Sequence, residues 1–253
     1  MIPERPPAYA GEPREPDGAP LPPWGVRECL IGLGLALAAL ATLLVLASVV
    51  TAATALQANS TRGELLSLAL TLLFEAAMLG IALSLTTGKW GGAMARLGWR
   101  AAPPVRWIGY SAMAVVLAWI TLIVYQVIAA ALGLSSLQPK SNVPTDLFKH
   151  AITLWPAIVL TVLIAPLCEE SFFRGFLFGG LRRRLGFAGA ASVSGVLFAV
   201  AHASAGLIIP FTVIGVIFAY VYLRSGTLWA SATAHFTFNL VSVIVTLATL
   251  GRS

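Results

Sequence analysis

Long apolar runs separated by short polar segments dominate the chain and predict an all-α, polytopic transmembrane helix bundle. About 18 or more apolar residues suffice for a helix to cross the roughly 30 Å hydrocarbon core of a bilayer. The fifth run is short and ends in the small and polar residues of 201–204, so we expect it to stop inside the protein or to tilt little. We count about seven spans, with six to eight allowed, at residues 29–54, 64–86, 107–133, 151–181, 187–203, 206–223 and 227–250.

The first 26 residues differ from the rest, because they are rich in proline, glycine and charge. Such a segment cannot bury enough apolar surface to offset the entropy of ordering it, so 1–26 is predicted to be a disordered tail. It has neither a short basic start nor an A-x-A site after a short apolar core, so we do not read it as a signal peptide. Residues 27–253 are then the transmembrane domain.

Charge changes this picture by giving the bundle an orientation. Charged residues make up 10% of the chain, against about 25% in soluble domains, and the net charge is +6. The basic residues lie in short loops, which fits membrane topology rather than nucleic-acid binding. Eleven of the 16 Lys and Arg residues fall on the side of the N-terminus. We therefore expect an integral protein of a bacterial cytoplasmic membrane, with the N-terminus in the cytoplasm and, after seven spans, the C-terminus outside.

Few ionisable groups interrupt the apolar runs, and each is a functional candidate because charge is costly in hydrocarbon. All but Glu75 fall in the last 85 residues, and Asn239 is a polar neighbour. The chain has two cysteines, Cys29 and Cys168, which give neither a disulfide framework nor a C-x-x-C site. The candidates are Glu75, Glu169, Glu170, Arg174, His202 and His235.

Glu170 and Arg174 stand at i and i+4, with the acid nearer the N-terminus, which is the favourable order for a pair on one helix face. Glu169 lies about 100° around the helix from Glu170 and is left without a partner on its own helix. This leaves Glu169 as a functional candidate. The alternative, that all three side chains form a buried ion cluster which only locks helices together, is about equally favoured by this motif.

Two further motifs place polar groups on helix faces. Phe198 lies one turn before His202, and His235 and Asn239 are four residues apart on one face. A single histidine in an apolar helix is more often a structural hydrogen-bonding group than a catalyst. His235 and Asn239 taken alone are also explained as polar contacts between membrane helices.

Depth makes the motifs more informative together. At 1.5 Å per residue from the basic loops, Glu169 lies about 20 Å deep, His202 about 24 Å, and His235 and Asn239 about 16 and 22 Å. A carboxylate and a histidine can hold a water molecule and take its proton. A second histidine and an asparagine can donate hydrogen bonds to a developing oxyanion. This inventory suits peptide hydrolysis without a covalent intermediate, because no serine or cysteine is evidently paired with a base.

In order and spacing, E-E-x-x-x-R at 169–174, F-x-x-x-H at 198–202 and H-x-x-x-N at 235–239 resemble the CAAX prenyl protease and bacteriocin-processing family. Its members are also called type II CAAX endopeptidases or Abi proteins. The resemblance covers a protease-like core at about 148–250. It implies an intramembrane endopeptidase in which Glu169 and His202 activate water and His235 and Asn239 stabilise the oxyanion. By the same resemblance, Glu170, Arg174 and Phe198 shape the site, and membrane-associated proteins or peptides are the substrates.

Alternatives remain for the metal and for the function. Glu169, His202 and His235 are a donor set that zinc accepts, but no H-E-x-x-H motif occurs, and the resemblance favours a site without metal or other cofactor. A non-enzymatic membrane scaffold, regulator or immunity protein retaining these motifs is the competing function. A transporter is less favoured, since no paired repeat halves are visible.

Overall fold

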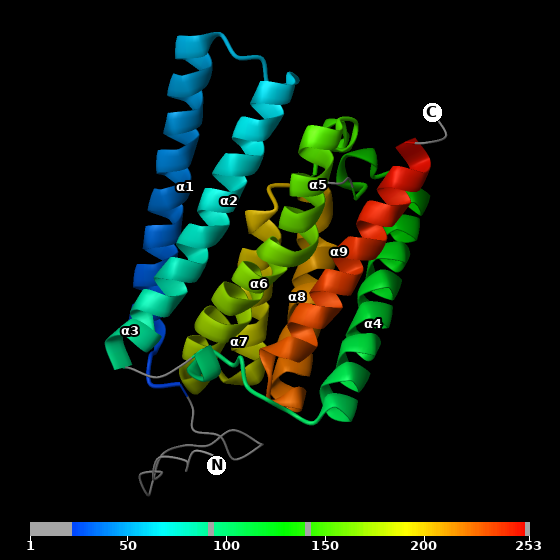
Figure 1. Cartoon of the computed structure of the whole chain (residues 1–253). Coiled ribbons are helices and arrows are strands. Elements are labelled where there is room, and N and C mark those ends of the chain that lie inside the picture. Colours follow the sequence, from blue (N-terminus) through cyan, green and yellow to red (C-terminus); the bar gives the residue numbers. More distant parts are fainter. Residues whose placement is uncertain (1–21, 91–93, 140–142, 251–253) are drawn as a thin grey trace, which may run out of the picture.

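The computed structural model describes residues 22–90, 94–139 and 143–250, and these residues form a bundle of long helices (Figure 1). Six helical stretches within them are long and apolar enough to cross a membrane. Most of the predicted tail, residues 1–21, lies outside the described residues. Trp24 is fully buried, and its indole Nε1 donates a hydrogen bond to the carbonyl oxygen of Phe176 at 2.9 Å, so the chain contacts the bundle before the first helix begins.

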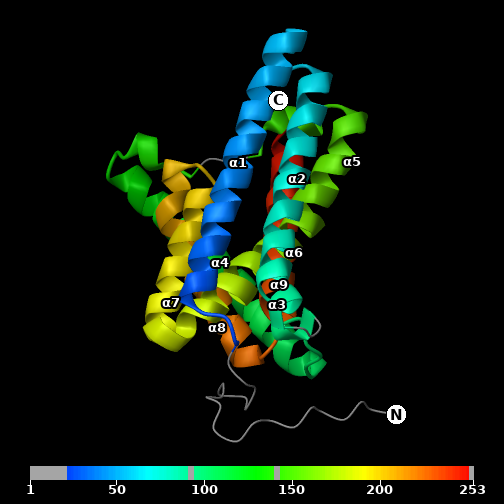
Figure 2. The same cartoon turned by 90° about the vertical axis from the view of Figure 1, so that its left-hand side faces the viewer.

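The first two helices form an antiparallel pair along one side of the bundle (Figures 1 and 2). Helix α1 spans Val26–Thr54 and α2 spans Thr61–Leu85, followed by the short α3 at Thr87–Trp90. Ser60 caps α2 by accepting a hydrogen bond from the backbone N–H of Gly63, which satisfies one of the free donors of the first turn. The sharp turn between the helices includes Ala55 in the left-handed region, with φ 50°.

Helix α4 spans Pro104–Ala131 and packs on the last two helices of the chain. Proline suits its first position, because the N–H that proline lacks would have no partner within the helix there. The contact is close because the residues in it are small: Ala114 and Ala118 are fully buried, and the Ser111 hydroxyl donates to the carbonyl oxygen of Ala230 at 2.8 Å.

One helical stretch, Ala151–Ala201, is too long to cross a membrane once. Its 51 residues would extend about 76 Å as a straight helix, more than twice the hydrocarbon thickness. Gly186 breaks it with φ 64° and ψ −173°, a conformation that glycine adopts without steric cost. Divided there, the six stretches are compatible with the seven predicted apolar runs.

This long stretch changes its helical form four times. It consists of α5 (Ala151–Val159), a π-helical stretch (Leu160–Ile164), α6 (Ala165–Glu169), a second π-helical stretch (Glu170–Phe178) and α7 (Gly179–Ala201). The part of α7 after Gly186 has only 15 residues and is about 22 Å long, which is less than the hydrocarbon thickness. The fifth run was expected to be short in this way. Glu169 and Glu170 of the first predicted motif therefore lie where α6 passes into the second π-helical stretch.

Helices α8 (Ile208–Ser225) and α9 (Leu228–Leu250) complete the bundle. The turn between them has Gly226 at φ 76° and is fixed to the 94–100 segment, because the N–H of Leu228 donates to the carbonyl oxygen of Gly98 at 2.8 Å. Helix α1 starts and α9 ends at opposite ends of the bundle (Figure 1), as an odd number of crossings requires. Which end faces the cytoplasm stays a prediction.

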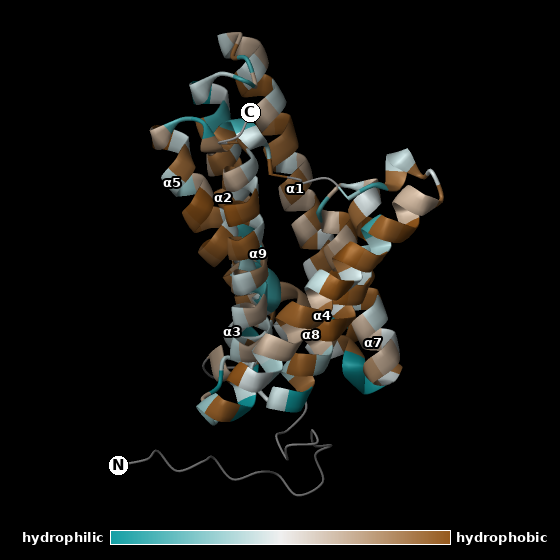
Figure 3. Cartoon of the chain, turned by 90° about the vertical axis from the view of Figure 1, so that its right-hand side faces the viewer, coloured by the Kyte–Doolittle hydropathy of each residue, from teal (hydrophilic) through white to brown (hydrophobic). Residues whose placement is uncertain are grey.

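The distribution of side chains is that of a membrane protein. Hydrophobic residues predominate along the helices, and hydrophilic ones are more frequent toward the two ends (Figure 3). Leu37, Leu44 and Val45 of α1 are each about 60% exposed, which suits contact with lipid. The core around α7 instead contains buried aromatic side chains, including Phe172, Phe176 and Phe198.

Candidate functional site

The two π-helical stretches shape the backbone around the motif residues. In the first, the N–H of Ala165 donates to the carbonyl oxygen of Leu160, five residues back. The next donor in that ladder would be residue 166, which is proline and has no N–H. The carbonyl oxygen of Thr161 is thereby left without its helical partner, and the side-chain Nδ2 of Asn239 donates to it at 2.8 Å. Pro166 thus gives α9 a point of attachment beside the candidate site.

Glu170 and Arg174 form a fully buried ion pair, with Arg174 Nη1 2.8 Å from Glu170 Oε1. Both side chains have no exposed surface. The guanidinium carbon of Arg174 also lies 4.2 Å from the ring centre of Phe198 and 5.3 Å from that of Phe218. Arg174 therefore has a carboxylate on one side and aromatic faces on others, while its Nε and Nη2 make no hydrogen bond to a described residue.

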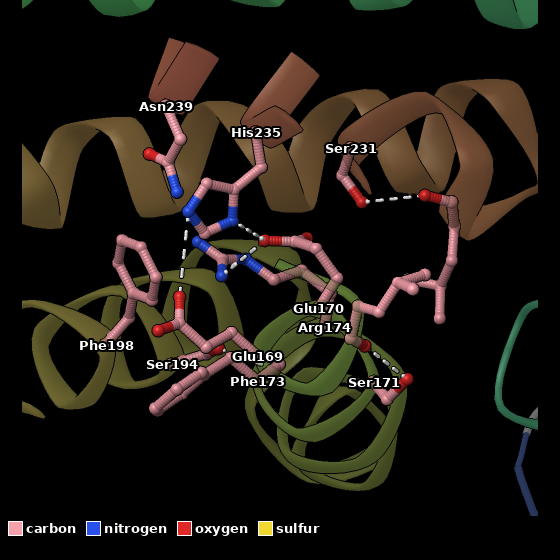
Figure 4. A network of polar contacts seen from close by, with 12 residues as sticks. Glu169, Glu170, Ser171, Phe173, Arg174, Ser194, Phe198, Ser231, His235 and Asn239 are labelled. Carbon is pink, nitrogen blue, oxygen red and sulfur yellow. Dashed lines mark hydrogen bonds and ion pairs between the residues drawn. The ribbon is translucent and has the colours of Figure 1, made fainter. Parts of the chain in front are cut away.

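His235 lies between the two glutamates (Figure 4). Its Nδ1 is 3.2 Å from Glu170 Oε1, and its Nε2 is 3.6 Å from Glu169 Oε2. Because the Glu170 carboxylate accepts hydrogen bonds, Nδ1 carries the proton, and Nε2 is the nitrogen that faces Glu169. The Glu169 side chain is 14% exposed, and its Oε2 makes no hydrogen bond to any described residue.

His202 follows the last residue of α7 and is held by the backbone of its own helix. Its Nδ1 is 2.8 Å from the carbonyl oxygen of Phe198, which can only accept, so Nδ1 donates and the neutral ring keeps a lone pair on Nε2. The rings of Phe198 and Phe211 both contact the imidazole edge-to-face, with centroids 4.7 Å away. No hydrogen bond joins His202 to Glu169 within the described part of the chain, and the Phe198 ring contacts both His202 and His235.

A small cavity lies beside His235 and Asn239. Its volume is about 10 Å³, close to the smallest that holds one water molecule. Its polar lining comes from those two side chains, and the rest is apolar. The lining residues are Phe198, Phe211, Ile214, Phe218, His235, Phe238 and Asn239.

The structure brings the predicted residues of three motifs together from separate crossings. Glu169, Glu170, Arg174 and His235 form one contact network, Phe198 packs against Arg174 and both histidines, and Asn239 shares the cavity with His235. The predicted Glu170–Arg174 pair is present. Catalytic roles for these residues stay predictions.

Sequence reasoning missed three features of the site. It did not connect His235 with Glu170, it gave no partner to Asn239, and it assigned no role to Glu75, which is buried in α2. A signal for Glu75 existed, because Leu68, Glu75 and Ala82 recur every seven residues on one face of α2, and all three are buried. Among the described residues, no group of three or more His, Cys, Asp and Glu side chains is arranged to hold a metal ion.

Fold and site together define a polytopic α-helical membrane protein with a buried Glu–Arg–His network. Residues 151–241 match the family described as "Type II CAAX prenyl endopeptidase Rce1-like". This match confirms the resemblance of the three motifs to that family. The chain outside 151–241 is not covered by that match.

Two curated proteins are similar to part of the chain. One is "Putative membrane peptidase YdiL" of Bacillus subtilis (strain 168), 32% identical over 90 residues, which are 36% of this chain and 37% of that protein. The other is "Uncharacterized protein" of Mycoplasma capricolum subsp. capricolum, 36% identical over 97 residues, 37% of this chain and 28% of that protein. The chain thus spans about a third of the length of these relatives. A comparison with solved structures finds no match.

Proposed function

We propose that this protein is an intramembrane endopeptidase that hydrolyses peptide bonds of membrane-associated proteins or peptides. The observation that carries the proposal is the convergence of three side chains from separate helical segments. Glu169 and His235 lie 3.6 Å apart, and the ring of Phe198 contacts both His235 and His202. Oε2 of Glu169 and Nε2 of His202 each keep a lone pair that accepts no hydrogen bond from a described residue. The endopeptidase family of residues 151–241 supports the same reaction.

In the proposed reaction, Glu169 and Nε2 of His202 hold the attacking water and take its proton. The oxygen of the substrate carbonyl becomes an oxyanion, which His235 and Asn239 stabilise as hydrogen-bond donors. His235 donates through Nε2 only when its ring carries both protons, with Nδ1–H held by the Glu170 carboxylate. Arg174 holds Glu170 in place, and no metal or other cofactor takes part.

The substrate class follows from the family and from the place of the site. The family description names prenyl endopeptidases, and the buried site suits a substrate that is itself anchored in the membrane. We therefore propose peptides and proteins held at the membrane, with the lipid bilayer as the working environment and without nucleic acid as a partner. Prenylated and unprenylated peptides of one sequence are the substrates to compare.

A proteolysis assay with the full chain in liposomes tests the proposal. We expect the wild type to cleave at least one class of membrane-anchored peptide and Glu169→Gln to lose cleavage while keeping the wild-type melting temperature. Glu64→Gln is the matched control. Glu64 is also a buried glutamate, but it lies in the first turn of α2 and not among the motif residues. Equal cleavage by wild type and Glu169→Gln would refute the assigned role. Absence of cleavage with every substrate would favour the scaffold or regulator function instead.

A further inference from the structure

An open pocket of about 350 Å³ lies at one end of the bundle, where α1 begins. Its walls come from residues 23–28 and from Gly180, Arg183 and Arg184 of α7. Figure 2 shows the start of α1 beside α7. The volume is in the range of small-molecule sites. None of the lining residues belongs to the candidate functional site, so the proposed reaction does not explain this pocket.

The walls of the pocket are held by tight packing. Trp24 is fully buried, and its hydrogen bond to the carbonyl oxygen of Phe176 fixes the segment before α1 to the core. Gly180 allows α7 to come close, because a Cβ there would lie 2.6 Å from Sγ of Cys29 and 2.6 Å from Cδ1 of Trp24. The pocket is therefore preformed by the fold, as most binding sites are.

Three arginine side chains from two crossings line the pocket. Arg27 lies in the first turn of α1, and Arg183 and Arg184 lie in α7 shortly before Gly186. All three residues are exposed, and none of their side chains forms an ion pair or a hydrogen bond with another described residue. A guanidinium offers five N–H donors in a planar fork that matches the oxygens of a phosphate group. The lining is thus suited to a phosphate.

The acidic residue of the lining, Glu28, does not cancel this charge. Its Oε2 accepts a hydrogen bond from the N–H of Gly25 at 3.0 Å, and its Oε1 lies 2.8 Å from Nζ of Lys89 in α3. The carboxylate is therefore already paired with a cation outside the lining. The bias of basic residues toward one side of the membrane explains why arginines gather at this end. That bias does not explain why two crossings far apart in the sequence bring them around one preformed pocket.

An exposed apolar face of α1 continues from the pocket. Ile31 and Leu35 follow Arg27 at intervals of four residues, which places them on the same side of the helix, and they are 41% and 47% exposed. A soluble anion does not require such a surface, whereas a phospholipid joins a phosphate to acyl chains. We propose that the pocket binds the headgroup phosphate of an anionic phospholipid, whose acyl chains lie along this face of α1. This inference does not depend on the proposed function.

Native mass spectrometry of the full chain in a neutral detergent tests the proposal, with retained lipids counted during titration with phosphatidylglycerol or phosphatidylcholine. One basic residue near anionic lipid contributes about fivefold in affinity, so three contribute about 10²-fold. We expect the wild type to bind phosphatidylglycerol more tightly. The triple variant Arg27→Gln, Arg183→Gln and Arg184→Gln should lose most of this preference. The single variants, with about a fivefold loss each, provide the same test if the triple variant does not fold.

The matched control removes the same charge from the same end of the bundle but outside the pocket, through Arg96→Gln, Arg106→Gln and Arg224→Gln. It should keep the wild-type preference for phosphatidylglycerol. Equal binding of the two lipids by the wild type would overturn the proposal. An equal loss of preference in both triple variants would do the same, because it would show an effect of net charge and not of the pocket.

A third ligand, inorganic phosphate, separates a lipid site from a site for a soluble anion. A ligand that binds the folded chain raises its melting temperature. We expect phosphatidylglycerol to raise the melting temperature of the wild type and of the control variant, and to raise that of the pocket variant much less. Inorganic phosphate should have little effect on any of the three. Equal stabilisation of the wild type by inorganic phosphate would refute the lipid as the occupant.

Discussion

Oxygen Oε1 of Glu170 lies 3.2 Å from Nδ1 of His235, and both side chains are buried. The same oxygen accepts a hydrogen bond from Arg174 at 2.8 Å. One carboxylate thus fixes the ring of the histidine on α9 and neutralises the arginine of its own helix. Glu170 is thereby the residue that joins the first motif to the third.

The buried pair makes a prediction for stability. Arg174→Ala leaves the Glu170 carboxylate without its cation, which typically costs about 3–5 kcal/mol when the pair is buried. We expect a clearly lower melting temperature in detergent and a lower yield of folded protein. Arg183→Ala, at an exposed arginine of the same helical stretch, should melt like the wild type. A wild-type melting curve for Arg174→Ala would contradict the buried pair.

A close helix crossing next to this pair makes a second prediction. A Cβ on Gly215 of α8 would lie 2.7 Å from Cα of Gly195 in α7 and 3.3 Å from Nη2 of Arg174. Gly215→Ala should therefore separate the helices and cost about 1–3 kcal/mol through overpacking. Gly109→Ala in α4 is the control, because nothing lies within 4 Å of its added Cβ. Equal thermal stability of the two variants would show that the crossing tolerates the extra carbon.

The arrangement of spans and the three motifs were predictable because they depend on short-range rules. Apolar length sets the number of crossings, and four-residue spacing pairs Glu170 with Arg174 on one helix face. The turn at Gly186 lies between the fourth and fifth apolar runs. The roles that the resemblance assigns to Glu169 and His202 remain to be measured.

The contacts between crossings were not predictable, because they depend on how helices rotate against one another. Spacing along α9 puts His235 and Asn239 on one face, but it does not say that His235 meets Glu170 or that Asn239 meets Thr161. The second contact exists because Pro166 leaves a carbonyl oxygen free in a π-helical stretch, a local departure that apolar patterns do not reveal. Such departures have to be seen in the structure.

The proposed metal-free site predicts insensitivity to chelators. Dialysis against a strong chelator should leave the cleavage rate unchanged, and added zinc should not raise it. A zinc hydrolase would lose activity and regain it with metal, since bound zinc lowers the pKa of its water and generates the nucleophile. Metal content after purification, measured by mass spectrometry, provides the independent check. Loss of activity with recovery on adding zinc would restore the metal alternative.

Orientation is a separate prediction, carried by the bias of lysine and arginine. With eleven of 16 basic residues on one side, the N-terminus should face the cytoplasm, and seven crossings put the C-terminus outside. A phosphatase reporter fused after the last residue should be active, and a fluorescent reporter that matures only in the cytoplasm should be dark there. The reverse pattern would mean that the chain is inverted or crosses an even number of times.

Asn239 allows the oxyanion role to be separated from acid–base chemistry. Its amide cannot titrate, one Nδ2–H donates to Thr161, and the side chain lines the small cavity beside His235. Removing one such donor costs about 10²–10³-fold in kcat. Asn239→Ala should therefore slow cleavage by that factor without changing the shape of the pH profile, whereas His235→Ala should change both.

Because the Asn239→Ala substitution also leaves the Thr161 carbonyl unsatisfied, about 1–3 kcal/mol of stability is expected to be lost, and rates must be compared well below the melting temperature. Ser242→Ala on the same helix, which removes only a hydrogen bond to Phe238, is the control and should retain the wild-type rate. A folded Asn239→Ala protein with the wild-type kcat would remove Asn239 from the catalytic set and leave it as a structural link between α9 and the π-helical stretch.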